Sequence, residues 1–237
     1  MAIAHLKFQK MLYILRLFGT FTNTWPPHPD VGKTELFLRN LYYYVAIFIS
    51  MAVWIPMIIS IYNSRNDDIG ILMKNVSHAA AIIEAILNSI FCRIKRRHLQ
   101  GLLISIEKFT RASNNREKVI LEKYVDRYAT FILVVATSFI MAGVTVICAP
   151  LFMPLEFPTT VWYPFSTKPL LRKFILYIMQ IFIITHTVLC FGVDVMIAVF
   201  LFYSTARIEM LSFEVEQAAN EISIISCVKK HQEIIGE

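Results

Sequence analysis

Long apolar stretches without charge constrain the fold of this chain more than any other feature. Residues 41–62 and 129–149 contain no charged side chain, and residues 174–203 contain only Asp194. A helix over residues 41–62 is about 33 Å long, enough to cross a hydrocarbon core of about 30 Å. These stretches therefore predict three membrane-spanning helices.

A fourth stretch, residues 69–92, is apolar but contains Lys74, His78 and Glu84. It can cross a membrane only if these groups face other helices or a wet cavity. Over the whole chain 57% of residues are apolar and 17% are charged, whereas soluble domains carry about 25% charged residues. We predict an all-α membrane protein with four transmembrane helices.

The basic residues lie unevenly along the chain. Eighteen lysines and arginines fall in residues 1–40, 93–128 and 204–237, against four in residues 63–68 and 150–173. Positive charge near membrane-spanning helices favours the cytoplasmic side. The bias predicts a cytoplasmic N-terminal segment, a transmembrane bundle over residues 41–203 and a cytoplasmic C-terminal segment. The net charge of +6 is thus attributed to topology, and no nucleic-acid partner is expected.

Two segments outside the spans have a pattern of their own. The expected outer loop, residues 150–173, has five prolines and the aromatic group VWYPF, which predicts a stiff, irregular segment. The C-terminal segment predicts an amphipathic helix that continues the fourth span. Its apolar stripe comprises Ile208, Leu211, Val215, Ala218, Ala219, Ile222 and Ile225.

Motifs of enzymes and of cofactor or metal sites are missing. The chain has no GxSxG, HExxH, Walker loop or GxGxxG, and its four cysteines lie far apart. The NVS sequon at Asn75 lies inside an expected span, so no glycan is predicted there. We expect a protein that is not an enzyme and has no cofactor or metal; the apolar composition favours a small apolar ligand.

Polar groups inside the spans have alternative interpretations. Lys74 is expected to extend to the interface rather than bind a ligand. His78 fits equally a hydrogen bond to a neighbouring helix and a donor that lines a cavity. His186 fits a structural hydrogen bond better than a ligand contact, and Glu84 and Asp194 fit pairing with basic or donor groups.

Several motifs in order resemble the insect odorant receptor family. They are FGTFTNTWPP (residues 18–27), the loop PLEFPTTVWYPFSTKP (154–169), LYIMQ (176–180), FGVDVMIAVF (191–200), and ARIEMLSFEVE and CVKKHQEII in the tail. The resemblance implies a seven-span receptor with a cytoplasmic N-terminus in the plasma membrane. It also implies an odorant-binding subunit of a ligand-gated cation channel, formed with the family's co-receptor. The match breaks off where a fifth span is expected, so we expect the sequence to be part of a longer receptor.

The resemblance implies a pocket in the outer half of the bundle that binds a small volatile ligand. Transferred by depth and helical phase, its lining residues form three groups, one on each of spans two, three and four. They are Asn75, His78, Ala79 and Ile82; Phe139, Ala142, Gly143 and Val146; and Met179, Phe182, Ile183 and His186.

Two other interpretations remain open at this point. A gustatory-type receptor explains the topology equally well. A four-span scaffold or accessory protein explains the spans and the charge bias but leaves the Trp-Tyr-Pro loop and Asp194 as coincidences. Co-expression separates them, because a receptor should assemble with the co-receptor and respond to volatiles.

Overall fold

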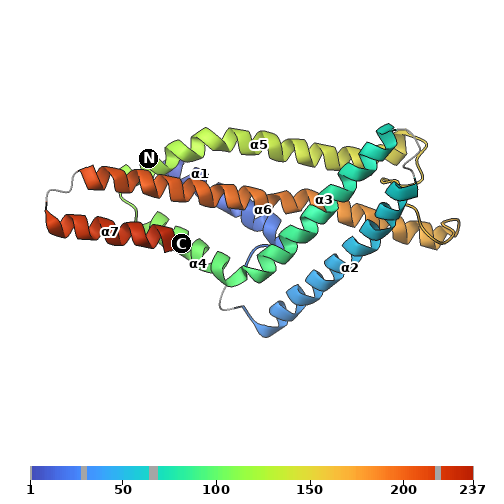
Figure 1. Cartoon of the computed structure of the whole chain (residues 1–237), viewed down its shortest axis with the longest axis horizontal. Helices are drawn as coiled ribbons and strands as arrows, with labels where there is room; N and C mark the ends of the chain where they lie inside the picture. The colour runs from blue at the N-terminus through green and yellow to red at the C-terminus, as the bar shows by residue number, and fades with distance from the viewer. Residues whose placement is uncertain (1, 28–30, 64–68, 217–219, 237) are drawn as a thin grey trace. The chain divides into compact units, whose positions relative to one another are not determined.

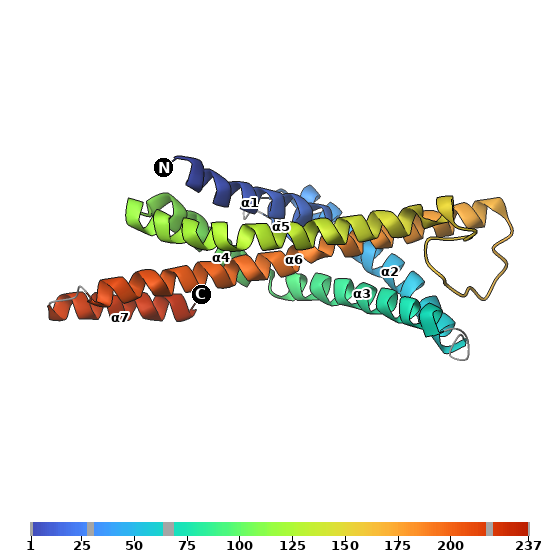
Figure 2. The same ribbon diagram turned by 90° about the horizontal axis from the view of Figure 1, so that it is seen from above.

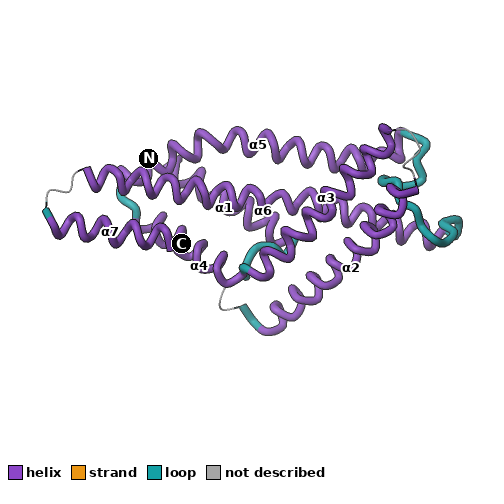
Figure 3. The backbone as a smooth tube through the Cα atoms, in the orientation of Figure 1, coloured by secondary structure: helices purple, strands orange, loops and turns teal. Residues whose placement is uncertain are grey.

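Helices make up most of this computed structural model, which describes residues 2–27, 31–63, 69–216 and 220–236 (Figures 1 and 3). No strand occurs within these described ranges. In chain order the helices are α1 (Ala2–Phe21), α2 (Lys33–Asn63), α3 (Ile69–Ile94), α4 (Arg96–Ala112), α5 (Asn115–Phe152), α6 (Leu170–Glu216) and α7 (Glu221–Gly236).

Helices α2, α3, α5 and α6 are long and apolar enough to cross a membrane. Each contains one of the four stretches predicted from the sequence, including the more polar second one. This confirms an all-α membrane protein with four membrane-spanning helices. Helix α6 also continues past the expected span, as far as Glu216.

The chain divides into two compact units. Unit 1 comprises Met1–Leu17, Lys95–Val134 and Gly192–Glu237, and unit 2 comprises Phe18–Ile94 and Val135–Phe191. Helices α5 and α6 each contribute one end to unit 1 and the other end to unit 2.

In unit 2, α2 and α3 run in opposite directions (Figures 1 and 2). The indole Nε1 of Trp54 on α2 donates a hydrogen bond to the Ala79 carbonyl on α3 at 3.1 Å. Asn23 follows shortly after the end of α1. It has a φ of 59°, a left-handed conformation that asparagine tolerates. Its side chain donates to the Arg39 carbonyl of α2 at 2.7 Å.

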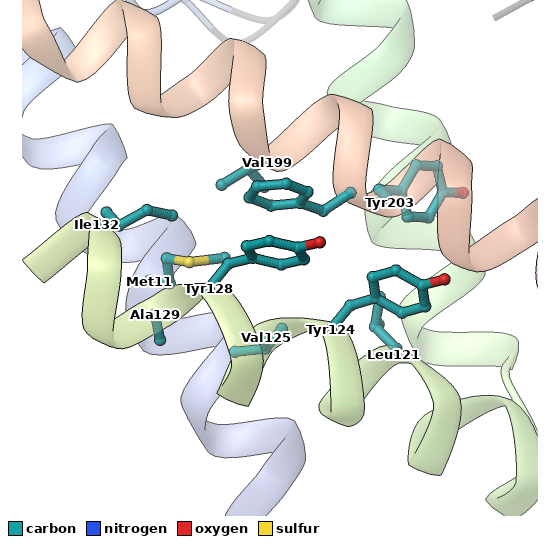
Figure 4. Close-up of a pocket in the computed structure, with 10 residues that line it drawn as sticks. Met11, Leu121, Tyr124, Val125, Tyr128, Ala129, Ile132, Val199 and Tyr203 are labelled. Atoms are coloured by element: carbon teal, nitrogen blue, oxygen red, sulfur yellow. The ribbon is translucent and has the colours of Figure 1, made fainter.

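In unit 1, α4, α5 and α6 pack through aromatic side chains. Tyr128 of α5, labelled in Figure 4 with Val199 and Tyr203 of α6, stacks on Phe202 of α6 with ring centroids 3.9 Å apart. Phe109 of α4 meets Tyr203 of α6 edge to face at 5.7 Å. The space beside the Tyr128 ring is about 10 Å³, room for about one water molecule. These side chains therefore form a filled core.

The buried face of the C-terminal part of α6 differs from the predicted stripe. Ile208 and Val215 are 52% and 54% exposed, whereas Tyr203, Ala206 and Met210 are buried. Contact with α4 sets the helical phase here, since Phe109 packs on Tyr203. Of the remaining predicted stripe, Leu211 is buried and Ile225 is exposed. Ala218, Ala219 and the side chain of Ile222 lie outside the described residues.

Three further differences concern segments between the spans. Helices α1 and α4 lie where no helix was expected. Helix α5 passes Pro150 and ends at Phe152, so the irregular loop covers residues 153–169. Pro150 lies in the last turn and removes one backbone donor, and beyond it the Met153 amide still donates to the Ala149 carbonyl at 3.0 Å.

Candidate functional site

Unit 2 contains an apolar cluster built from α2, α3 and α6. Its buried members are Val53, Met57, Ala79, Ile82, Ile86 and Ile183, and residues such as Trp54, Val161 and Met179 pack against it. Ile183 is fully buried. The cluster therefore includes three of the residues predicted to line a pocket, Ala79, Ile82 and Ile183, with Met179 beside them.

The buried face of α3 begins with a polar residue. Asn75, Ala79, Ile82 and Ile86 follow one another at steps of four, three and four residues, which places them on one face of the helix. All four are buried, and Asn75 has no exposed surface. The carboxamide of Asn75 thus lies on the same face as the apolar cluster.

The polar atoms of this carboxamide have no hydrogen-bond partner. Both Nδ2 and Oδ1 of Asn75 are buried and unpaired, as are Nδ1 of His78 and Oγ1 of Thr159 and Thr187. A buried polar group without a partner costs about 1–3 kcal/mol. Native proteins contain few such groups, so each needs an explanation such as a bound ligand.

The loop over residues 153–169 is fastened to α6 by Gln180. Its side-chain Oε1 accepts a hydrogen bond from the Thr159 amide at 3.0 Å, and its Nε2 donates to the Tyr163 hydroxyl at 3.2 Å. Gln180 has no exposed surface. Between these two contacts, Val161 packs against the apolar cluster. The loop therefore covers part of the cluster.

Burial raises the pKa of Tyr163 above its ordinary value of 10.0, although the hydrogen bond from Gln180 acts in the opposite direction. The phenol consequently stays neutral at physiological pH. It can accept the Gln180 hydrogen bond without placing a charge beside apolar side chains.

His186, another predicted lining residue, has several contacts within unit 2. It hydrogen-bonds the backbone of Thr22, its Nδ1 lies 3.6 Å from the Cys190 sulfur, and its ring stacks on Phe182 at 5.9 Å. Phe182 in turn meets Tyr42 of α2 edge to face. These contacts give His186 and Phe182 a structural role in holding α6 to its neighbours.

The four predicted residues of α5 lie apart from the members of the apolar cluster. Phe139 is 46% exposed and stacks on Phe191 of α6 at 4.5 Å. Ala142 is exposed and Val146 is half-buried. At Gly143 an added Cβ would lie 2.5 Å from Cγ2 of Val188. Phe139 and Gly143 thus pack closely on α6, and none of the four belongs to the cluster that includes Ile183.

Sequence reasoning missed the contributions of α2 and of Gln180. Val53 and Met57 lie one turn apart and are completely buried, but a span that is apolar on every side gives no phase signal. Among the described residues no group of three His, Cys, Asp or Glu side chains could hold a metal ion. What this region offers is a buried apolar cluster with a few unpaired polar atoms nearby in unit 2. Apolar side chains with a few polar atoms are the composition typical of small-molecule sites.

Comparison with known proteins gives the family. The sequence model of the 7tm Odorant receptor family matches residues 68–236. No curated protein sequence matches the chain. The fold is similar to the solved insect olfactory receptor OR5 from Machilis hrabei, with a TM-score of 0.74 at 15% identity. The same receptor in complex with eugenol gives a TM-score of 0.72 at 14% identity.

In both comparisons the aligned region covers 97% of this chain and 63% of the solved receptor. At this level of identity the structural likeness concerns the fold. The family match covers α3 to α7 completely and includes the loop fastened by Gln180. The chain belongs to the 7tm Odorant receptor family.

Proposed function

We propose that unit 2 is the odorant-binding part of an olfactory receptor subunit, and that this subunit forms a ligand-gated cation channel with the odorant receptor co-receptor. The observation that carries the ligand site is the carboxamide of Asn75, fully buried on the face of an apolar cluster with neither polar atom paired. The related receptor from Machilis hrabei was solved with eugenol. A small volatile molecule of this kind fits a mostly apolar site with one or two polar atoms.

The proposed orientation puts the N-terminus in the cytoplasm and the protein in the plasma membrane. Its support is the excess of lysine and arginine on the segments before α2, between α3 and α5, and after α6. The loop over residues 153–169 then lies outside the cell. A ligand arriving from outside would meet this loop before it meets the cluster that Val161 covers.

Ligand binding would act on the channel by differential affinity. A ligand shifts an equilibrium between closed and open states only if it binds one state more tightly than the other. In unit 2 the loop and α6 are joined through Gln180, so a ligand that alters the packing below the loop would also alter α6.

Ligand binding and co-receptor assembly can be tested separately. The chain spans 63% of the solved receptor, so binding is the activity that its own residues can be tested for. We expect purified chain in lipid nanodiscs to show a melting temperature that rises with the concentration of certain volatiles. Ile183→Trp, which places a larger side chain at the centre of the cluster, should abolish the rise, while Ile178→Trp on the exposed side of the same helix should keep it. Equal responses of both variants would contradict the site.

The partner proposal has its own readout. Tagged chain co-expressed with the co-receptor should co-purify with it after mild detergent extraction. An unrelated multi-span protein expressed at the same level is the control. Recovery no greater than that of the control would contradict the assembly but not the ligand site.

A further inference from the structure

The unpaired polar atoms of unit 2 have a defined chemistry. The carboxamide of Asn75 presents one acceptor, Oδ1, and a donor group, Nδ2, and both are buried without a partner. A ligand with only an acceptor oxygen could pair Nδ2 and would leave Oδ1 unpaired. A ligand without any polar atom would leave both unpaired. A hydroxyl group can serve both atoms, because it donates one hydrogen bond and accepts others.

The surroundings of Asn75 set the rest of the ligand. On the same face of α3 the next positions are Ala79, Ile82 and Ile86, and they pack with Val53, Met57 and Ile183. A ligand whose polar end meets Asn75 therefore has apolar side chains along its body. The arrangement of one amide beside aliphatic side chains selects for a molecule with a single polar group.

We propose that the site binds small apolar molecules that carry one hydroxyl group, such as alcohols and phenols, and that the Asn75 carboxamide recognises the hydroxyl. This inference rests on the proposed function, since it names the ligand class of the same site. Pairing both amide atoms removes the free-energy cost of burying them unpaired. The ligand's hydroxyl should therefore increase affinity despite the cost of desolvating it. His78, one turn along α3 with an unpaired buried Nδ1, is a second group that could meet the ligand's oxygen.

Asn75 could instead serve as a glycosylation site or pair with a buried water. Glycosylation conflicts with its lack of any exposed surface. The sequon also needs Ser77, which is exposed on α3. Ser77→Ala therefore removes the sequon but keeps the carboxamide, and it is the matched control for Asn75→Leu. A buried water would make Asn75 structural, and Asn75→Leu would then leave that water without a partner.

The test compares ligands of equal size that differ at one end. One series is octanol, heptyl methyl ether and nonane, and a second is para-propylphenol and para-propyltoluene. Affinities are measured on the full chain in nanodiscs by the ligand-dependent fluorescence of Trp54, which packs against the cluster. Trp54→Phe records the background from the other tryptophans, and empty nanodiscs correct for partition into lipid.

We expect the hydroxyl compound to bind about tenfold more tightly than the hydrocarbon of the same size, with the ether between them. In Asn75→Leu this ratio should fall to about one, while Ser77→Ala keeps it. The melting temperature of ligand-free Asn75→Leu should rise, because the substitution removes two unpaired polar atoms.

Three results would overturn the inference. Equal affinity of hydroxyl and hydrocarbon compounds in the unaltered chain would show that the amide reads no polar group, and this comparison does not depend on any variant folding. An unchanged ratio in Asn75→Leu would show that another group recognises the hydroxyl. A sharp fall of its melting temperature would show that Asn75 has a structural partner. In each of these cases the ligand site itself would stand, whereas no binding of any probe would overturn the proposed function together with the inference.

Discussion

Unit 1 pairs its polar side chains, whereas unit 2 buries several without a partner. In unit 1 the buried hydroxyls of Thr110 and Ser113 donate to backbone carbonyls at 2.7 and 3.0 Å, and Lys230 pairs with Glu214 at the surface. Within the described residues, every buried side-chain N or O atom without a partner belongs to unit 2. Among the described residues, buried polar groups are thus left unpaired only in unit 2.

Paired and unpaired polar groups have different consequences for stability. A satisfied polar group helps to fix a fold, while an unsatisfied one costs stability and is kept when a bound molecule completes it. In unit 1 the space beside Tyr128 holds about one water, and a cavity of about 220 Å³ lies beside Phe109, Arg207 and Lys230. Unit 2 has a cluster with unpaired donors and acceptors under a fastened loop. We propose that ligand binding belongs to unit 2 because the unpaired donors and acceptors lie there.

The largest expected effect comes from truncating the centre of the cluster. Ile183→Ala removes a side chain with no exposed surface, so we expect a loss of about 2–5 kcal/mol in the free energy of unfolding. Ile178→Ala, 48% exposed on the same helix, should change it by less than about 1 kcal/mol. Thermal unfolding in detergent measures both, and equal losses would break the assignment of the buried face.

Release of the loop should have the next largest effect. Gln180→Leu leaves the Thr159 amide unpaired, which should cost about 1–3 kcal/mol, and should speed hydrogen exchange over residues 153–169. Tyr163→Phe removes only the second hydrogen bond, so its effect should be smaller. If exchange in the loop is unchanged in Gln180→Leu, the loop is held by other contacts.

Gly143 in unit 2 and Gly101 in unit 1 differ most in how closely neighbouring atoms surround them. Gly143→Ala in unit 2 would bring a Cβ to 2.5 Å from Cγ2 of Val188, and valine has little rotamer freedom on a helix. We expect it to lower stability by about 1–3 kcal/mol. Gly101→Ala in unit 1 meets nothing within 4 Å and should raise stability by about 0.5–1 kcal/mol. Melting temperatures that move in the same direction would contradict the packing at Gly143.

The smallest effect is expected at the surface of unit 1. Lys230→Ala removes an ion pair of 2.6 Å between half-exposed side chains, which should cost less than about 1 kcal/mol and nothing measurable at high salt. The neighbouring exposed Lys229→Ala is the control. A loss from Lys230→Ala that persists in high salt would show that this pair is structural.

The sequence was sufficient for the membrane-spanning helices. An uncharged stretch long enough to cross a bilayer has few alternatives to a helix, so α2, α5 and α6 were predictable. The residues of α3 were predicted only through the family resemblance, by depth and helical phase. Of these, Asn75, Ala79 and Ile82 lie buried on one face.

The rest depends on tertiary contacts that no local pattern encodes. Helix α5 is apolar on every side within its span. Its sequence therefore gives no indication that Phe139 and Ala142 are exposed. The hydrogen bonds of Gln180 to the loop join residues 17 and 21 positions apart, across a segment rich in proline. The lack of partners for Asn75 is likewise a property of the packed structure.

The most direct test of the difference between the units is photoaffinity labelling with a diazirine-bearing aliphatic alcohol on the full chain in nanodiscs. Labelled positions are located by mass spectrometry, with and without excess octanol. We expect the labelling that octanol suppresses to fall in unit 2, on α3 around Asn75 and Ala79 and on α6 around Ile183. Suppressible labelling on the unit 1 core around Tyr128 and Phe202, or labelling that octanol does not suppress anywhere, would contradict it.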